Sequence, residues 1–324
     1  SDVCSSDLLD GAVKAMRRFV RDAELARESD LASLDAGALR IARQQLHQAS
    51  GALEMVGMGS PALVLRAMES AVQKFVQRPE QCTDEAAAVI ERASFALIEY
   101  LENVLGGKSA SAVALFPQYR DARALAGGER AHPADLWPAE RRFREPEDSV
   151  AVAPLPYGPE ARARLDSAVL KIVKSGDLSA ATSMRETCLG FVAAQSDRHA
   201  RAFWKICAGF FEALGKGMLA PDVYVKRVAS RVLMQYATLA KGDTAIADRL
   251  VQDLLFFCSQ ARPADGEEDK AAALQAVRKS FGLERFKPVD YETARFGRFD
   301  PALLAQARKR IASATETWSA LAEI

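Results

Sequence analysis

The chain has 324 residues, and its 43 lysines and arginines balance 43 aspartates and glutamates, so the formal net charge is zero. Broad nucleic-acid binding needs an excess of positive charge to displace counterions, so we expect no nucleic-acid partner. No stretch approaches the roughly 18 consecutive apolar residues of a membrane span, and we expect no membrane insertion.

The composition favours helices over strands. Alanine, leucine, arginine and glutamate are abundant, and aromatic residues make up only 7% of the chain. The five cysteines are scattered, and no two stand at metal-ligand spacing. No charged start followed by an apolar run marks a signal peptide. These features predict a cytoplasmic, all-α protein with reduced thiols, no bound metal and no cofactor.

Both ends of the sequence have unusual features. Residues 1–8 read SDVCSSDL, which resembles the in-frame translation of a sequencing adaptor, so we exclude them from fold reasoning. At the other end, a helical pattern that includes Ile311, Trp318 and Leu321 runs to Ile324 without a cap or a breaker. This pattern predicts that the native protein continues and that its second domain is truncated here.

Residues 9–108 show the periodicity of four helices joined by short loops. Apolar residues of the second helix recur in steps of three and four, which is typical of the buried side of a bundle helix. Thr83 is expected to cap the fourth helix, and Gly106 and Gly107 to close it. The segment therefore predicts a four-helix up-down bundle.

Residues 109–157 are rich in proline and glycine, and they predict an extended linker with short elements. Two places are expected to form such elements, namely Val113 with Leu115 and Phe116, and a strand-like piece at Val150, Val152 and Leu155. The strand-like piece is expected to pack on a helical bundle.

Helical periodicity returns in residues 158–324, which predict a second all-α domain. The expected helices are 160–175, 179–195, 198–214, 221–240, 244–260, 270–281 and 301–324. Their short turns indicate antiparallel pairs, and a solenoid-like stack is an alternative, although the segments share no fixed period.

One histidine has surroundings that could support chemistry. His47 follows the core residue Leu46 in the second predicted helix, so it is expected to flank the core and face outward. Gly51 lies one turn later and is costly inside a helix, by about 1 kcal/mol relative to alanine. An open patch beside the imidazole would explain this glycine, because a partner domain could bring an aspartyl phosphate there. His47 is thus a candidate phosphoryl acceptor.

The predicted docking face shares one side of the second helix with His47. Residues three and four apart lie on the same face of a helix. Arg43 precedes the histidine by one turn, Ser50 and Gly51 follow it by one turn, and Glu54 follows it by two. The same residues in a generic bundle helix would only form a solvated surface.

The run from Leu46 to Leu53 resembles the H-x-x-K-G motif of histidine-phosphotransfer (HPt) domains. Leu63, Leu65, Met68 and Glu69 are similar to the L-x-x-L-x-x-x-L-E stretch of that family's next helix. The whole chain resembles the N-terminal region of ChpA/PilL-type chemotaxis hybrid histidine kinases and the related FimL scaffold family. Residues 51–56, which read GALEMV, and residues 66–69, which read RAME, carry most of this likeness.

The resemblance implies a place in a chemotaxis-like two-component pathway that controls type IV pili and twitching motility. Ser50 occupies the position of the HPt lysine, which leaves two interpretations open. The first is a scaffold or degenerate HPt region that docks partners, and the second is an active HPt domain of a hybrid sensor kinase, phosphorylated on His47. A third interpretation is a generic helical protein-interaction module.

The implied partners are response-regulator receiver domains, a sensor kinase or proteins of the pilus-bearing cell pole, where the protein could be recruited. The sequence has no G-x-x-x-x-G-K-S/T or G-x-G-x-x-G motif for a phosphate cradle. We therefore expect a signalling scaffold or phosphotransfer region rather than an enzyme, with any kinase catalytic domain outside this chain.

Overall fold

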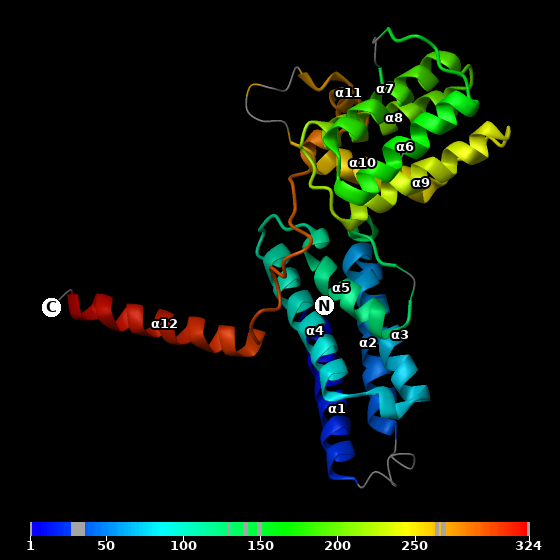
Figure 1. Cartoon of the computed structure of the whole chain (residues 1–324). Coiled ribbons are helices and arrows are strands. Elements are labelled where there is room, and N and C mark those ends of the chain that lie inside the picture. The colour runs from blue at the N-terminus through cyan, green and yellow to red at the C-terminus, as the bar shows by residue number, and fades with distance from the viewer. Residues whose placement is uncertain are drawn as a thin grey trace. The chain divides into compact units, whose positions relative to one another are not determined.

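The computed structural model describes residues 2–26, 36–128, 130–138, 142–147, 151–262, 266 and 270–322, with the side chains of 2–4 and 322 excepted. Within these residues every regular element is helical and no strand occurs (Figure 1). The predicted all-α class is confirmed. The chain divides into two compact units, which we call unit 1 (residues 1–138 and 290–324) and unit 2 (residues 139–289).

Unit 1 is built on a four-helix bundle. Its helices are α1 (Asp2–Leu25), α2 (Gly37–Met55), α3 (Gly59–Gln77) and α4 (Asp84–Leu105). Each helix packs on the next, and α1 also packs on α4, so the four close around one core. Fully buried side chains from all four helices fill this core, among them Leu9, Met16, Leu39, Leu46, Met68, Phe75, Ile90 and Leu97. The predicted four-helix arrangement is confirmed.

Local interactions explain how α4 begins and how it is attached. The Thr83 hydroxyl accepts a hydrogen bond from the backbone N–H of Ala86 at 3.2 Å, as the sequence predicts. Arg17 of α1 lies 2.6 Å from Asp84 and 3.3 Å from Glu91, so it joins α1 to the first two turns of α4.

Residues 112–137 are a folded part of unit 1, which differs from the extended linker predicted over 109–157. They form η3 (Ala112–Leu115), α5 (Phe116–Leu125) and η4 (Pro133–Leu136), and α5 packs on α3 and α4. Pro117 and Pro133 lie at the starts of helices, where the missing N–H costs nothing. The prolines therefore begin helices here instead of preventing them.

Unit 1 also includes the segment 290–297, which the sequence placed in the second domain. Gln118 of α5 donates a hydrogen bond to the Phe296 carbonyl at 2.9 Å. The Phe296 ring meets Tyr100 of α4 edge-on, with 6.0 Å between centroids. The predicted domain 158–324 is therefore too long, because its last part packs on the bundle.

Gly297 allows this segment to approach α4 closely. Its φ is +76°, and a Cβ there would lie 2.7 Å from the Arg92 carbonyl oxygen and 2.9 Å from the Ala96 Cβ. The backbone N–H of Gly297 donates to a Glu99 carboxylate oxygen at 2.9 Å. Both the backbone conformation and the contact favour glycine at this position.

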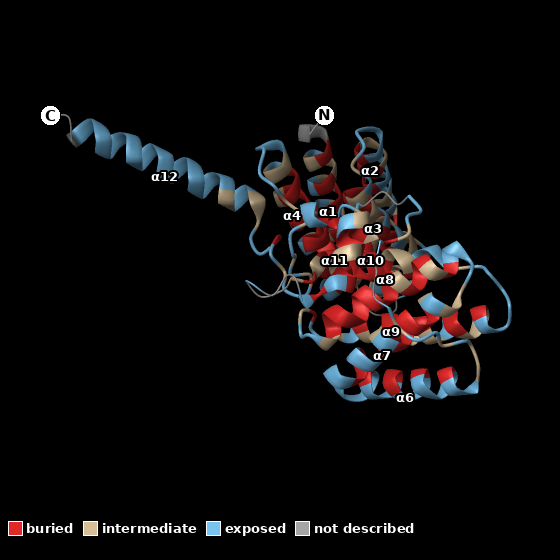
Figure 2. Ribbon diagram, turned by 90° about the horizontal axis from the view of Figure 1, so that it is seen from above, coloured by how far each residue is buried: buried red, intermediate tan, exposed pale blue. Residues whose placement is uncertain are grey.

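The last helix, α12 (Pro301–Ala322), is almost wholly exposed (Figure 2). Its large apolar side chains, including Ile311 and Trp318, face solvent.

Unit 2 contains six α-helices in its described part: α6 (Pro159–Ser175), α7 (Leu178–Ala194), α8 (Arg198–Gly215), α9 (Val223–Ala240), α10 (Asp248–Gln260) and α11 (Ala272–Ser280), followed by the 3₁₀ helix η6 (Leu283–Arg285). Helix α8 packs on α7, α10 and α11, and α6 packs on α9. Since repeats of a solenoid contact only their neighbours, this arrangement is a globular domain with α8 at its centre and not a solenoid.

Small and buried polar residues let α8 sit at the centre. A Cβ at Gly209 would lie 2.9 Å from Val277 of α11, so the glycine permits close packing of the two helices. Glu212 is buried, accepts the Leu274 backbone N–H at 3.1 Å and forms an ion pair with Arg185 of α7. This carboxylate therefore links three helices of unit 2.

The predicted helices of unit 2 are confirmed with small shifts at their ends. Helix α10 begins at Asp248 instead of residue 244. The Gln235 side chain explains the difference, because it donates to the Ala245 carbonyl at 2.8 Å and accepts the Ala247 N–H at 3.0 Å. These bonds hold the preceding residues outside the helix.

The predicted strand-like piece lies along α7 as an extended segment. The Leu155 backbone N–H donates to the Gly190 carbonyl at 2.9 Å, and a Cβ on Gly190 would lie 2.8 Å from Leu155. Val152 is half-buried, and Val150 lies outside the described residues.

Candidate functional site

His47 lies on the outer side of the bundle, where α2 faces α3. Its side chain is 71% exposed, whereas that of Glu69 on α3 is 18% exposed. The His47 Nδ1 lies 3.0 Å from Glu69 Oε1. A carboxylate only accepts hydrogen bonds, so in a neutral imidazole this contact favours the tautomer with the proton on Nδ1 and the lone pair on Nε2. In that tautomer the nucleophilic atom is Nε2, on a side chain that is 71% exposed.

A polar hollow of about 610 Å³ surrounds the imidazole. We call it the α2–α3 hollow, and its lining residues are Arg43, His47, Ser50, Gly51 and Glu54 from α2 and Arg66, Glu69, Ser70 and Gln73 from α3. The structure thus brings together His47 and the four residues of the predicted docking face.

Gly51 and Ser50 shape the part of the hollow next to His47. An added Cβ at Gly51 would meet no atom within 4 Å, so this helical glycine adjoins open space. Ser50 is buried, and its short side chain takes up little of the hollow. The site therefore offers room for a group brought by another molecule.

Two ion pairs neutralise the charges of the hollow. Glu54 pairs with Arg66, and Glu69 lies 3.4 Å from Arg43. Sequence reasoning placed Glu54 near His47 but missed the partners Arg66 and Glu69, which come from the next helix. The run at residues 66–69, which supplies much of the family likeness, was the available signal.

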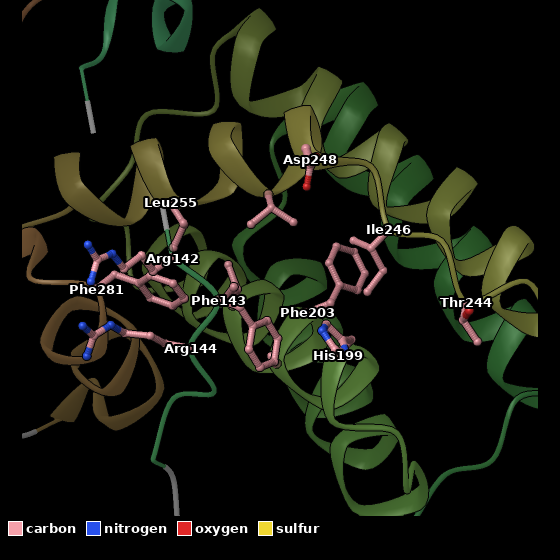
Figure 3. Close-up of a pocket in the computed structure, with 13 residues that line it drawn as sticks. Arg142, Phe143, Arg144, His199, Phe203, Thr244, Ile246, Asp248, Leu255 and Phe281 are labelled. Carbon is pink, nitrogen blue, oxygen red and sulfur yellow. The ribbon is translucent and has the colours of Figure 1, made fainter. Parts of the chain in front are cut away.

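Unit 2 has another hollow, of about 390 Å³, and most of the side chains that line it are apolar. In Figure 3, Phe143, Phe203 and His199 lie near one another, with Arg142 and Arg144 toward one end and Thr244 toward the other. The Phe143 and His199 rings are 4.3 Å apart between centroids. Exposed His199 thus belongs to an aromatic surface contributed partly by a segment outside the helices.

Glu145 attaches that segment to α8. Its carboxylate lies 2.9 Å from Arg201, 3.1 Å from Lys205 and 3.6 Å from Arg198. The hydrogen bond from Arg201, supported by Lys205, holds the pKa of Glu145 below its ordinary value.

The cysteines form no chemical centre among the described residues. Cys82, Cys188, Cys207 and Cys258 are free and buried, and burial raises the pKa of Cys82 and of Cys258 to about 12. No cluster of three or more metal-ligating side chains occurs in the described part of the chain. Across the same residues, none of the helices combines the length and apolarity that crossing a bilayer requires.

The fold and the α2–α3 hollow define an all-helical protein of two units with an exposed imidazole on its bundle. Residues 151–294 match the family model described as the second domain of the FimL scaffold protein, and they coincide closely with unit 2. Over these residues the chain is similar to the second domain of the FimL scaffold protein, as the sequence resemblance predicts. Comparisons with curated proteins and with solved structures find no match.

Proposed function

We propose that this protein is a scaffold of a chemotaxis-like pathway that controls type IV pili, and that the α2–α3 hollow docks a receiver domain. The match of residues 151–294 to a scaffold domain supports the general role. The observation that carries the docking surface is the open space at Gly51 beside exposed His47. A bundle helix without a partner would gain stability from alanine at this position.

The chemistry of the hollow suits a phosphorylated receiver. Arg43 and Arg66 keep 40% and 56% of their side chains exposed while they pair with the glutamates. An aspartyl phosphate brought into the hollow would therefore meet two guanidinium groups, which bind phosphate oxygens in bidentate geometry. The ion pairs keep these groups in place when no partner is bound.

A matched pair of glycine variants tests the docking surface. Gly51→Gln adds a side chain to the hollow, and Gly59→Gln adds the same side chain outside it; at both positions the new Cβ would meet no atom within 4 Å. We expect Gly51→Gln to weaken binding of a cognate receiver domain by about tenfold or more, as for loss of a central contact. Gly59→Gln should bind like wild type, and both variants should keep the wild-type circular dichroism. Unchanged binding by Gly51→Gln would contradict the docking surface.

A second candidate function is phosphotransfer at His47, and the contact between its Nδ1 and Glu69 favours it. In this step the Nε2 lone pair attacks the phosphorus of a receiver aspartyl phosphate. The N–P bond forms, the bond between phosphorus and the aspartyl oxygen breaks, and the aspartate leaves as a carboxylate. Throughout the step, Glu69 accepts a hydrogen bond from the Nδ1–H group and stabilises the positive charge that develops on the ring.

Acid-labile labelling distinguishes phosphotransfer from docking alone. Wild type and His47→Gln are incubated with a receiver that carries labelled aspartyl phosphate. If His47 accepts the phosphoryl group, label should appear on wild type and not on His47→Gln. Glu69→Gln should acquire label more slowly than wild type. Equal labelling of wild type and His47→Gln would exclude His47 as the acceptor. Receiver binding without any label would leave the scaffold as the function of this site.

A further inference from the structure

Helix α12 presents apolar side chains that no part of the described chain covers. Trp318 is 75% exposed and Ile311 is 66% exposed, and Figure 2 shows the helix exposed along nearly its whole length. An isolated helix gains most of its stability from packing of an apolar face, so a surface of this kind points to a binding partner.

Six apolar residues of α12 follow a heptad repeat, and Leu303, which is 63% exposed, lies beside it. The six alternate in steps of three and four through the whole helix, which is the pattern of a coiled-coil seam. The seam consists of Leu304, Ala307, Ile311, Ala314, Trp318 and Leu321. The larger side chains Leu304, Ile311 and Trp318 occupy one heptad position, and the other position holds two alanines and Leu321.

The order of large and small side chains along the seam allows two copies of it to fit together when the helices run antiparallel. We propose that α12 forms an antiparallel coiled coil with α12 of a second copy of this chain. In the register that aligns the two seams, Trp318 faces Ala307 of the second copy and Ile311 faces its Ala314. Leu304 faces Leu321 at each end, so every alanine of the seam is paired with a larger side chain.

A parallel pair of the same helices would pack poorly. Each residue would face its own counterpart, so a layer of two tryptophans would follow a layer of two alanines. The residues beside the seam also tolerate the antiparallel register. There Arg308 faces Thr315 of the second copy and Arg310 faces its Thr317, so no like charges oppose one another.

The dimer is expected to be weak. Twenty-two residues give a helix about 33 Å long, which holds only three heptads. Interfaces of small area belong to transient complexes, so dimerisation should depend on concentration in the full chain.

Substitutions at two neighbouring positions test the seam in the full chain. Ile311→Glu places a charge in it, and Ala312→Glu places the same charge on the solvent side. We expect wild type and Ala312→Glu to form dimers in sedimentation velocity as the concentration rises. Ile311→Glu should raise the dissociation constant by about tenfold or more. Since Trp137 and Trp204 are buried, a blue shift of tryptophan emission on dimerisation should come from Trp318.

Cysteine cross-linking tests the direction of the helices in a background with Cys4→Ser. The other natural cysteines are buried and should not compete. The antiparallel register places position 311 next to position 314 of the second copy. Mixing Ile311→Cys with Ala314→Cys should therefore give mixed disulfide dimers faster than either variant alone.

Three results would overturn the proposal. One is a wild-type chain that stays monomeric up to about 100 μM, far above the range of most specific complexes. Another is a dimer that Ile311→Glu does not weaken, which would place the interface elsewhere. The third is preferred cross-linking of Ile311→Cys with itself, which would indicate a parallel pair. A monomer with protected Trp318 would mean that α12 packs within its own chain.

Discussion

Two glycines inside helices of unit 1 have opposite surroundings. A Cβ at Gly51 would meet nothing within 4 Å, whereas a Cβ at Gly11 of α1 would lie 2.6 Å from the Gln45 side chain of α2. A side chain at Gly11 would thus displace the end of the Gln45 side chain, whereas one at Gly51 would displace nothing. The difference separates a glycine at a contact between helices from one that adjoins open space.

Alanine substitutions measure this difference. Gly51→Ala should stabilise unit 1 by about 0.5–1 kcal/mol, because alanine restricts the unfolded chain and fits a helix interior. Gly11→Ala should give a smaller gain or a loss, because Gln45 must move. Urea unfolding monitored by circular dichroism gives both values. Equal stabilisation by the two substitutions would contradict the difference between the surroundings of Gly51 and those of Gly11.

The sequence could predict the residues of the site on one helix but not their partners. Helical spacing alone places Arg43, Gly51 and Glu54 on the face that carries His47. Glu69 could not be assigned a role, because its distance from the imidazole depends on how α3 is rotated against α2. That rotation follows from packing of the whole core, which no short motif encodes.

At the scale of elements, residues 142–147 lie against α8 through the Phe143 ring, the Pro146 carbonyl and the Glu145 carboxylate. Glu145 is surrounded by Arg198, Arg201 and Lys205, and its pKa is lowered chiefly by the hydrogen bond from Arg201. Because the pKa of Glu145 is lowered in the folded state, the carboxylate stabilises this contact at pH values above the ordinary glutamate pKa. The contribution is lost as the pH falls through the pKa of the folded state.

Acidification and Glu145→Gln should therefore release the same segment. In wild type, hydrogen exchange of residues 142–147, corrected for intrinsic rates, should rise between neutral pH and about pH 3. Glu145→Gln should exchange faster at neutral pH and show a smaller change with pH, with unit 2 still folded. Equal pH dependence in both proteins would mean that other carboxylates hold the segment.

Periodicity predicted most helices because their apolar faces and their glycine stops are local features of the chain. Helix α5 was missed for a physical reason. The proline and glycine content of residues 109–157 favoured the prediction of an extended linker, although proline is well tolerated at the first turn of a helix, where Pro117 lies. The start of α10 was placed too early because a hydrogen-bonded side chain of α9, Gln235, determines it.

At the scale of the whole molecule, unit 1 is discontinuous in sequence. It contains residues 1–138 and resumes at residue 290, after all of unit 2. The sequence did not predict that residues 290–297 pack on the bundle of unit 1. These residues contain few apolar side chains and form no regular element that a sequence pattern could indicate. Only the folded bundle shows that Gly297 fits against α4.

Gly297→Ala should disturb this return. The substitution introduces a Cβ at positive φ, which costs about 1–2 kcal/mol, and a contact 2.7 Å from the Arg92 carbonyl oxygen. We expect faster hydrogen exchange in residues 293–299 and lower stability of unit 1. Gly282→Ala is the matched control, since Gly282 has φ +62° in unit 2 but no atom within 4 Å of the added Cβ. Similar exchange of residues 293–299 in both variants would contradict the role of this contact.

The interrupted course of unit 1 has a consequence for biosynthesis. A ribosome releases the bundle before unit 2, yet the groups that Glu99 and Tyr100 bind are made only after residues 139–289 have emerged. The bundle is thus completed by residues that are synthesised later. A nascent chain stalled within unit 2 would hold a bundle whose α4 surface is still uncovered, and quality-control factors could recognise it there.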